Sequence, residues 1–105
     1  MNAGFFGMLA DGAFIINGGR GPQVDDDDLL AALDSGKLGG AALDVFAVEP
    51  LPQDHPFWTH PKVRVWPHVA AQTNATSAAE QVAAAITAMM DGSEPANRVD
   101  WSRGY

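Results

Sequence analysis

The chain has 105 residues, 47% hydrophobic and 9% aromatic, which is typical of one small globular domain. Its formal net charge of -7 argues against a nucleic-acid partner, and the lack of cysteine excludes disulfides and thiolate metal sites. With no visible signal peptide and no apolar run long enough to span a bilayer, we expect a cytoplasmic protein with no membrane partner.

The first predicted strand runs over residues 13–17 and leads into a glycine-rich turn. Asn2 is suited to cap a short helix before this strand, ending near Leu9. The strand carries no charge, which is typical of a strand buried on both faces in a parallel sheet. Its turn places Arg20 where open α/β sheets bind their ligands. The alternative is a solvated arginine in an ordinary turn.

Four aspartates at 25–28 precede an apolar helical segment and indicate a helix N-terminus capped by Asp25. A metal site is disfavoured, because neighbouring side chains on a helix diverge by about 100°. Residues 41–45 then predict a strand that closes a right-handed βαβ unit. The crossover makes this strand parallel to the first, so Asp44 and Glu49 should lie at the same sheet edge as Arg20.

A proline-rich loop over 46–61 follows, with Phe57 and Trp58 expected to anchor it on the sheet. A third strand over 63–66 stops at Pro67, which puts His68 at a strand's carboxyl end. Residues 74–90 predict a long helix with an apolar stripe in which the methionines serve as core. The fold class is therefore α/β, with about three parallel strands, flanking helices and a long C-terminal helix.

Together these strands would deliver Arg20, Asp44, Glu49 and His68 to one edge. Histidine exchanges protons near neutral pH, a carboxylate can hold its second ring nitrogen, and arginine grips a carboxylate through two hydrogen bonds. The residues alone leave open that His68 and Glu49 are structural. Metal-dependent hydrolysis through the three histidines is weaker, because their spacing matches no ligand pattern.

Four blocks of the sequence resemble the C-terminal signature blocks of the D-isomer-specific 2-hydroxyacid dehydrogenases. They are Asn-Gly-Gly-Arg-Gly at 17–21, the helix at 29–36, Ala-Leu-Asp-Val-Phe-x-x-Glu-Pro at 42–50 and Pro-His-Val-Ala-Ala at 67–71. The loop after Pro50 and the end of the chain at 99–105 are similar to the branch that reduces glyoxylate and hydroxypyruvate.

This resemblance implies an NAD(P)H-dependent reduction of a small 2-keto acid to glycolate or glycerate, with NADPH favoured. It implies that Arg20 binds the substrate, that His68 protonates the carbonyl oxygen, and that Glu49 keeps His68 proton-donating. Asp44 would bind the nicotinamide carboxamide, and the backbone at Gly18 and Gly19 would pass close to the cofactor, beside Arg20 and His68. A full-length enzyme of this kind is expected to be a homodimer.

The sequence also departs from the family pattern. No Gly-x-Gly-x-x-Gly turn is present, and nothing corresponds to the family's substrate domain. We therefore expect residues 1–92 to be the C-terminal part of the NAD(P)-binding domain and 93–105 a polar tail. Such a fragment should be inactive alone and should not bind the cofactor tightly. The alternative is a non-catalytic binding or assembly module that keeps a Rossmann-like fold.

Overall fold

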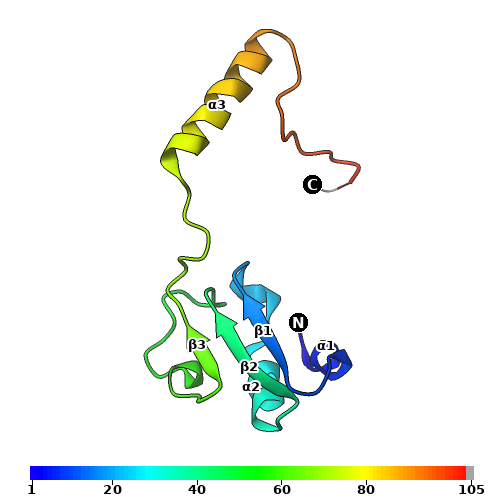
Figure 1. Cartoon of the computed structure of the whole chain (residues 1–105), viewed down its shortest axis with the longest axis vertical. Helices are drawn as coiled ribbons and strands as arrows, with labels where there is room; N and C mark the ends of the chain where they lie inside the picture. Colours follow the sequence, from blue (N-terminus) through cyan, green and yellow to red (C-terminus); the bar gives the residue numbers. More distant parts are fainter. Residues whose placement is uncertain (104–105) are drawn as a thin grey trace. The chain divides into compact units, whose positions relative to one another are not determined.

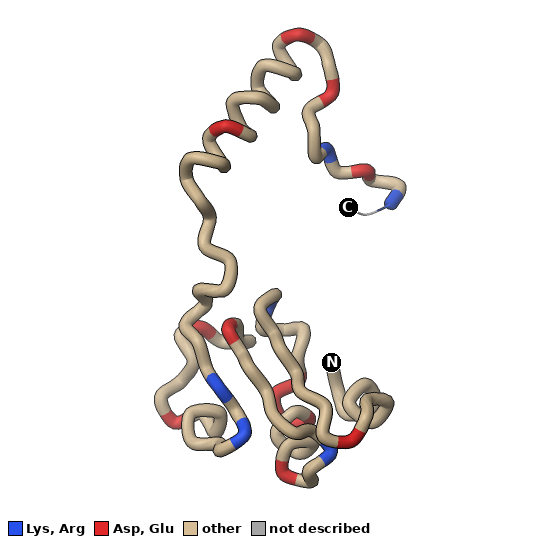
Figure 2. The backbone as a smooth tube through the Cα atoms, viewed as in Figure 1, with Lys and Arg blue, Asp and Glu red and all other residues tan. Residues whose placement is uncertain are grey.

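A computed structural model describes residues 1–103 of the chain. The chain divides into two compact units, Met1–Ala71 and Gln72–Tyr105. The candidate site residues all belong to the first unit. Figure 2 shows that each unit carries both acidic and basic residues along its backbone.

The first unit is built on a parallel sheet of three strands in the order β1-β2-β3 (Figure 1). These are β1 (Ala13–Asn17), β2 (Leu38–Leu43) and β3 (Val63–Val65). Asn17 pairs with Leu43, and Leu43 pairs with Val65. This register brings the carboxyl ends of the strands to one edge, as the predicted α/β fold requires.

Both predicted helix caps in this unit are confirmed. The Asn2 side chain accepts a hydrogen bond from the Phe5 amide at the start of α1 (Ala3–Met8). The Asp25 side chain does the same for the Asp28 amide at the start of α2 (Asp26–Asp34). The acidic run therefore serves the N-terminus of α2, where carboxylates oppose the positive end of the helix dipole.

The core lies on one face of the sheet, between the strands and the helices. Its largest fully buried side chains are Phe6, Leu29, Leu33, Leu38, Leu43 and Phe57. The prediction that residues 13–17 are buried on both faces is wrong. Ile15 and Asn17 are buried, whereas Phe14 and Ile16 are 74% and 81% exposed. Side chains alternate between the faces of a strand, and within residues 1–71 no element covers the second face.

Strand β2 begins at Leu38, three residues before the predicted start at 41. The extra residues are glycines for a steric reason. A Cβ on Gly39 would overlap the carbonyl oxygen of Gly12, and one on Gly40 would lie 2.6 Å from the Phe14 ring. At Gly39 the obstacle is backbone, so only glycine permits this close approach of β2 to the residues before β1.

The proline-rich loop is anchored mainly by Phe57, which is 1% exposed, in a short 3-10 helix η2 (Pro56–Trp58). Trp58 stays 51% exposed and donates from its indole nitrogen to the Pro52 carbonyl at 2.8 Å. Another 3-10 helix, η1 (Gly21–Gln23), follows the glycine-rich turn.

The second unit contains the predicted long helix as α3 (Ala75–Met90), capped by Asn74. Its apolar stripe does not form a core: no residue of α3 is buried, and Met89 and Met90 are 70% and 82% exposed. The described part of this unit holds no second helix or strand against which α3 could pack. Among the described residues, no helix is long and apolar enough to cross a membrane.

The tail carries turns after Gly92, up to the last described residue. Trp101 is 89% exposed, so it does not anchor the tail. Gly104 and Tyr105, which contribute to the family resemblance, lie outside the described residues. The boundary expected at residue 92 stays a prediction.

Candidate active site

The turn after β1 is held by side chains on either side of Arg20. Asn17 is buried; its Oδ1 accepts from the Gly19 amide and its Nδ2 donates to the Arg20 carbonyl, both at 3.2 Å. Gln23 Oε1 accepts from the Arg20 amide at 2.9 Å. The backbone of Arg20 is thus fixed on both sides of its Cα atom.

The side chain of Arg20 has no acidic partner among the described residues. The residue is exposed, and its Nη1 donates to the Gly19 carbonyl at 2.8 Å. Of the ion pairs found within residues 1–103, none involves this guanidinium. An exposed guanidinium without a carboxylate partner is a suitable site for an anion.

Gly21 joins this turn to the loop that carries Glu49. A Cβ on Gly21 would overlap the carbonyl group of Phe46, so the two backbones touch directly. The Phe46 amide in turn donates to Glu49 Oε1 at 2.9 Å. The arginine turn and the glutamate loop are therefore packed as one edge.

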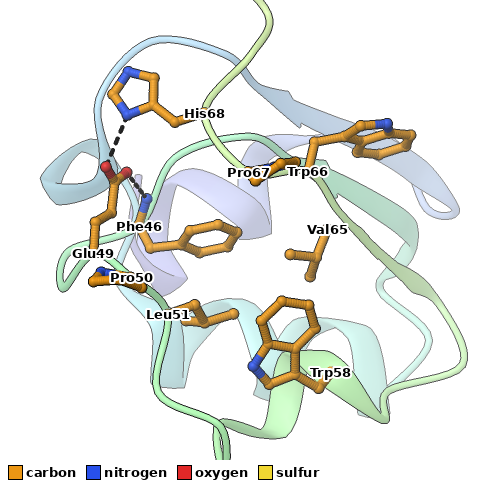
Figure 3. A pocket seen from close by; sticks show the side chains of 9 residues that line it. All are labelled: Phe46, Glu49, Pro50, Leu51, Trp58, Val65, Trp66, Pro67 and His68. Atoms are coloured by element: carbon orange, nitrogen blue, oxygen red, sulfur yellow. Dashed lines mark hydrogen bonds and ion pairs between the residues drawn. The ribbon is translucent and has the colours of Figure 1, made fainter.

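Glu49 and His68 form the closest side-chain pair of this edge (Figure 3). The distance from Glu49 Oε2 to His68 Nδ1 is 2.8 Å. The hydrogen bond with His68, followed by the one from the Phe46 amide, lowers the pKa of the Glu49 carboxyl. The His68 side chain is 48% exposed, and its Nε2 has no hydrogen-bond partner within the described chain.

Asp44 directly follows β2 and accepts hydrogen bonds from three consecutive backbone amides, which begin at His68. Its carbonyl accepts from the His68 amide at 2.8 Å. Its carboxylate oxygens accept from the Val69 amide at 2.8 Å and the Ala70 amide at 2.9 Å. Burial acts to raise the pKa of this carboxyl, but the two amides and the nearby His68 outweigh it, and the pKa is lowered.

Two hollows flank the edge. One, of about 410 Å³, lies beside Glu49 and is mainly apolar, with Phe46, Leu51, Trp58 and Val65 among its lining residues (Figure 3). The other, of about 310 Å³, is lined in part by Gly18, Asp44 and Ala70. A Cβ on Gly18 would lie 3.4 Å from Ala70 Cβ, so glycine keeps this side open.

The other histidines lie elsewhere. His55 Nε2 is 3.8 Å from Asp26 Oδ2, and His60 Nε2 is 3.2 Å from Asp34 Oδ1. Both partners belong to α2, so these histidines tie the loop to that helix. They do not join His68 in a ligand set.

The structure therefore brings Asp44, Glu49 and His68 into one hydrogen-bonded group and leaves Arg20 on the adjacent turn. Sequence reasoning missed Asn17 and Gln23 as supports of Arg20, and the Phe46 amide as a support of Glu49. Asn17, directly before the glycines, carried a usable signal, since asparagine side chains often bond their own turn. Gln23 carried none.

The sequence profile described as "D-isomer specific 2-hydroxyacid dehydrogenase, NAD binding domain" matches residues 1–70. Proteins named glyoxylate/hydroxypyruvate reductase A from Serratia proteamaculans and Salmonella newport are 50% and 48% identical over all 105 residues. The chain spans about a third, 34%, of the length of each.

Solved structures agree with this match. A D-isomer specific 2-hydroxyacid dehydrogenase from Xanthobacter autotrophicus, in complex with NADPH and MES, matches with a TM-score of 0.92 and 45% identity, over 100% of this chain and 43% of that one. An NADPH-dependent glyoxylate/hydroxypyruvate reductase from Sinorhizobium meliloti, in complex with NADP and sulfate, matches with a TM-score of 0.89 and 41% identity, over 100% of this chain and 35% of that one.

Proposed function

The chain belongs to the family of D-isomer specific 2-hydroxyacid dehydrogenases, and from this premise we propose that it forms the catalytic edge of a glyoxylate/hydroxypyruvate reductase. The observation that carries the proposal is the Glu49–His68 pair: Glu49 Oε2 lies 2.8 Å from His68 Nδ1, and His68 Nε2 has no hydrogen-bond partner among the described residues. The reaction would convert glyoxylate to glycolate and hydroxypyruvate to glycerate.

Each residue of the edge has a role that its contacts support. The Arg20 fork would bind the substrate's carboxylate and carbonyl oxygens. His68 Nε2 would donate the proton to the carbonyl oxygen as that oxygen gains negative charge. Glu49, hydrogen-bonded to Nδ1, would favour the protonated imidazole and fix the ring's orientation.

The residues present fit the nicotinamide end of a dinucleotide. Gly18 and Gly19 expose backbone at the carboxyl end of β1, and Asp44 lines the hollow next to Gly18. We propose that the two glycines, Arg20, Asp44 and His68 border this ring, with the Asp44 carboxylate accepting from its carboxamide. The bound cofactor supplies the hydride. The NADPH and NADP complexes of relatives favour a phosphorylated dinucleotide.

The chain by itself should neither bind the dinucleotide tightly nor turn over. Its sequence holds no Gly-x-Gly-x-x-Gly turn, so the pyrophosphate has no cradle here. The homodimeric state of a longer form and its cytoplasmic location stay predictions.

A chimaera tests this proposal. The chain would replace the matching segment of the Serratia proteamaculans relative, which supplies the remaining two thirds of the sequence. We expect glyoxylate-dependent NADPH oxidation by the chimaera and none by the 105-residue chain. His68→Gln in the chimaera should reduce the rate by about 10²-fold or more, the range for a lost general acid. The exposed Asp54→Asn is the matched control.

The outcomes separate the alternatives. A folded chimaera that binds NADPH but reduces neither keto acid would favour the non-catalytic module. A His68→Gln variant with the parent rate would remove His68 from the chemistry. Turnover by the isolated chain would contradict its proposed inactivity.

A further inference from the structure

We propose that Asp44 is a positioning residue for His68: its buried carboxylate holds the peptide groups that follow His68 and thereby fixes the imidazole against Glu49. The proposal builds on the proposed function, because its consequence for catalysis requires His68 to be the proton donor. The hold of Asp44 on the His68 segment can be tested by NMR, without an activity assay.

The His68 segment has little else to hold it. His68, Val69 and Ala70 are all exposed, so packing contributes little to their position. Asp44 supplies the hydrogen bonds: its carbonyl binds the His68 amide, and its carboxylate oxygens bind the Val69 and Ala70 amides at 2.8 and 2.9 Å. The segment is thus fastened to the end of β2 through one residue.

The backbone of His68 shows why such a fastening is needed. Its φ angle is 55°, in the left-handed region that residues with a Cβ rarely adopt. Such a conformation persists only where surrounding contacts impose it. Released from Asp44, His68 would return to a more favourable φ, and the direction of its side chain would change. The contact between His68 Nδ1 and Glu49 Oε2 depends on that direction.

The carboxylate is suited to this task because both of its oxygens accept hydrogen bonds. An asparagine of nearly the same shape offers one acceptor oxygen, and its amide nitrogen would face a backbone N–H. Asp44→Asn therefore breaks one of the two bonds while changing the volume very little. Each oxygen of Asp44 also retains acceptor capacity, so the proposed carboxamide contact and the hold on His68 are compatible.

The first experiment uses the ¹⁵N-labelled 105-residue chain. Amide hydrogen exchange is measured at Val69 and Ala70, the backbone coupling constant at His68, and the ring nitrogen shifts of His68. We expect Asp44→Asn to accelerate exchange at one or both amides by about 10-fold or more and to move the ring nitrogen shifts of His68, because the contact with Glu49 is lost. The exposed Asp54→Asn should match the parent in every signal.

Glu49→Gln supplies the opposite control. It should change the ring nitrogens of His68 while leaving the exchange at Val69 and Ala70 slow, which shows that the hold runs from Asp44 to His68. A folded Asp44→Asn chain with parent couplings and ring shifts would overturn the proposal.

If Asp44→Asn unfolds, acid titration of the parent chain decides. The Val69 and Ala70 amide shifts should follow one low-pH titration, with the His68 backbone coupling changing in step. Independent behaviour of these signals would overturn the proposal.

In the active chimaera, Asp44→Asn should lower kcat by about 10-fold or more and move the pH dependence of kcat, while the KM for glyoxylate stays near the parent value because the Arg20 turn is intact. An unchanged pH profile would contradict the positioning role and leave the reductase function standing. An inactive chimaera combined with the expected NMR changes would remove the function and leave the hold on His68 standing.

Discussion

The Glu49 carboxylate lies 2.8 Å from Nδ1 of His68, although 19 positions separate them in the chain. The second carboxylate oxygen is bound by the Phe46 amide at 2.9 Å, so the carboxylate has a fixed direction. A carboxylate held at Nδ1 accepts a hydrogen bond from that nitrogen and fixes the tautomer and orientation of the ring. Glu49 should therefore control the direction in which His68 Nε2 faces a substrate.

Glu49→Gln tests this control in the chimaera. We expect a decrease in kcat of about 10-fold to 100-fold, since the imidazole loses the charged partner that fixes its tautomer and orientation. Steady-state rates with glyoxylate provide kcat, and the ring nitrogen shifts of His68 provide a second readout. Ring nitrogen shifts at the parent values would show that Glu49 does not act through His68.

Arg20→Lys tests the anion clamp. Lysine keeps the charge but lacks the planar fork, so bidentate binding of the substrate carboxylate is lost. We expect the KM for glyoxylate to rise by about 10-fold or more, the equivalent of one hydrogen bond to a charged group. The exposed Asp54→Asn variant serves as the control and should keep the parent KM for glyoxylate. Equal KM values for glyoxylate in parent and variant would remove Arg20 from substrate binding.

The stability of the isolated chain should fall in acid. The pKa values of Asp44 and Glu49 are both lowered in the fold. Such groups contribute stability above their unfolded pKa values, near 4, and lose it as the pH falls through their folded values. Urea unfolding at pH 7, 4 and 3 should show this loss. Glu49→Gln should show a shallower loss than the parent, and a loss as steep as the parent's would contradict the linkage.

Several features of the fold and of the candidate site could be predicted from the sequence because they depend on local rules. Asp25 before an apolar helix predicts a cap, and a helix between two apolar segments predicts a parallel pair. The parallel pair then places Asp44 at the same edge as Arg20. Each step uses neighbours in the chain or the handedness of a crossover.

Other features depend on contacts between distant segments and carried no local signal. The left-handed backbone of His68 follows from its bonds to Asp44, 24 positions earlier. The exposure of Ile16 depends on which elements cover the sheet, because an uninterrupted apolar strand reads the same whether one face or both are covered. Met89 is exposed for the same reason: periodicity identifies a face, and a neighbour must be present to bury it.

Gly21→Ala tests whether the close contact between the backbones of Gly21 and Phe46 requires a residue without a side chain. The new Cβ would overlap the Phe46 carbonyl, where backbone meets backbone and no flexible side chain can move away. We expect a loss of about 1–3 kcal/mol in the free energy of unfolding. Gly7→Ala is the control: its Cβ meets nothing within 4 Å in α1, so it should stabilise by about 0.5–1 kcal/mol. Thermal unfolding of both variants provides the measurement, and a neutral Gly21→Ala would contradict the close approach.

Adjacent isoleucines of β1 should respond differently to the same substitution: one should lower the stability of the chain and the other should leave it unchanged. Ile15 is 6% exposed and belongs to the core, whereas Ile16 is 81% exposed on the uncovered face. Ile15→Thr buries a hydroxyl and loses apolar contacts, so the chain should unfold at a clearly lower urea concentration. Ile16→Thr keeps a β-branched residue in the strand and removes apolar surface from water, so it should preserve the urea midpoint and raise the concentration at which the chain aggregates. Light scattering against concentration measures the second effect. Equal urea sensitivity of the two variants would show that the second face is covered after all.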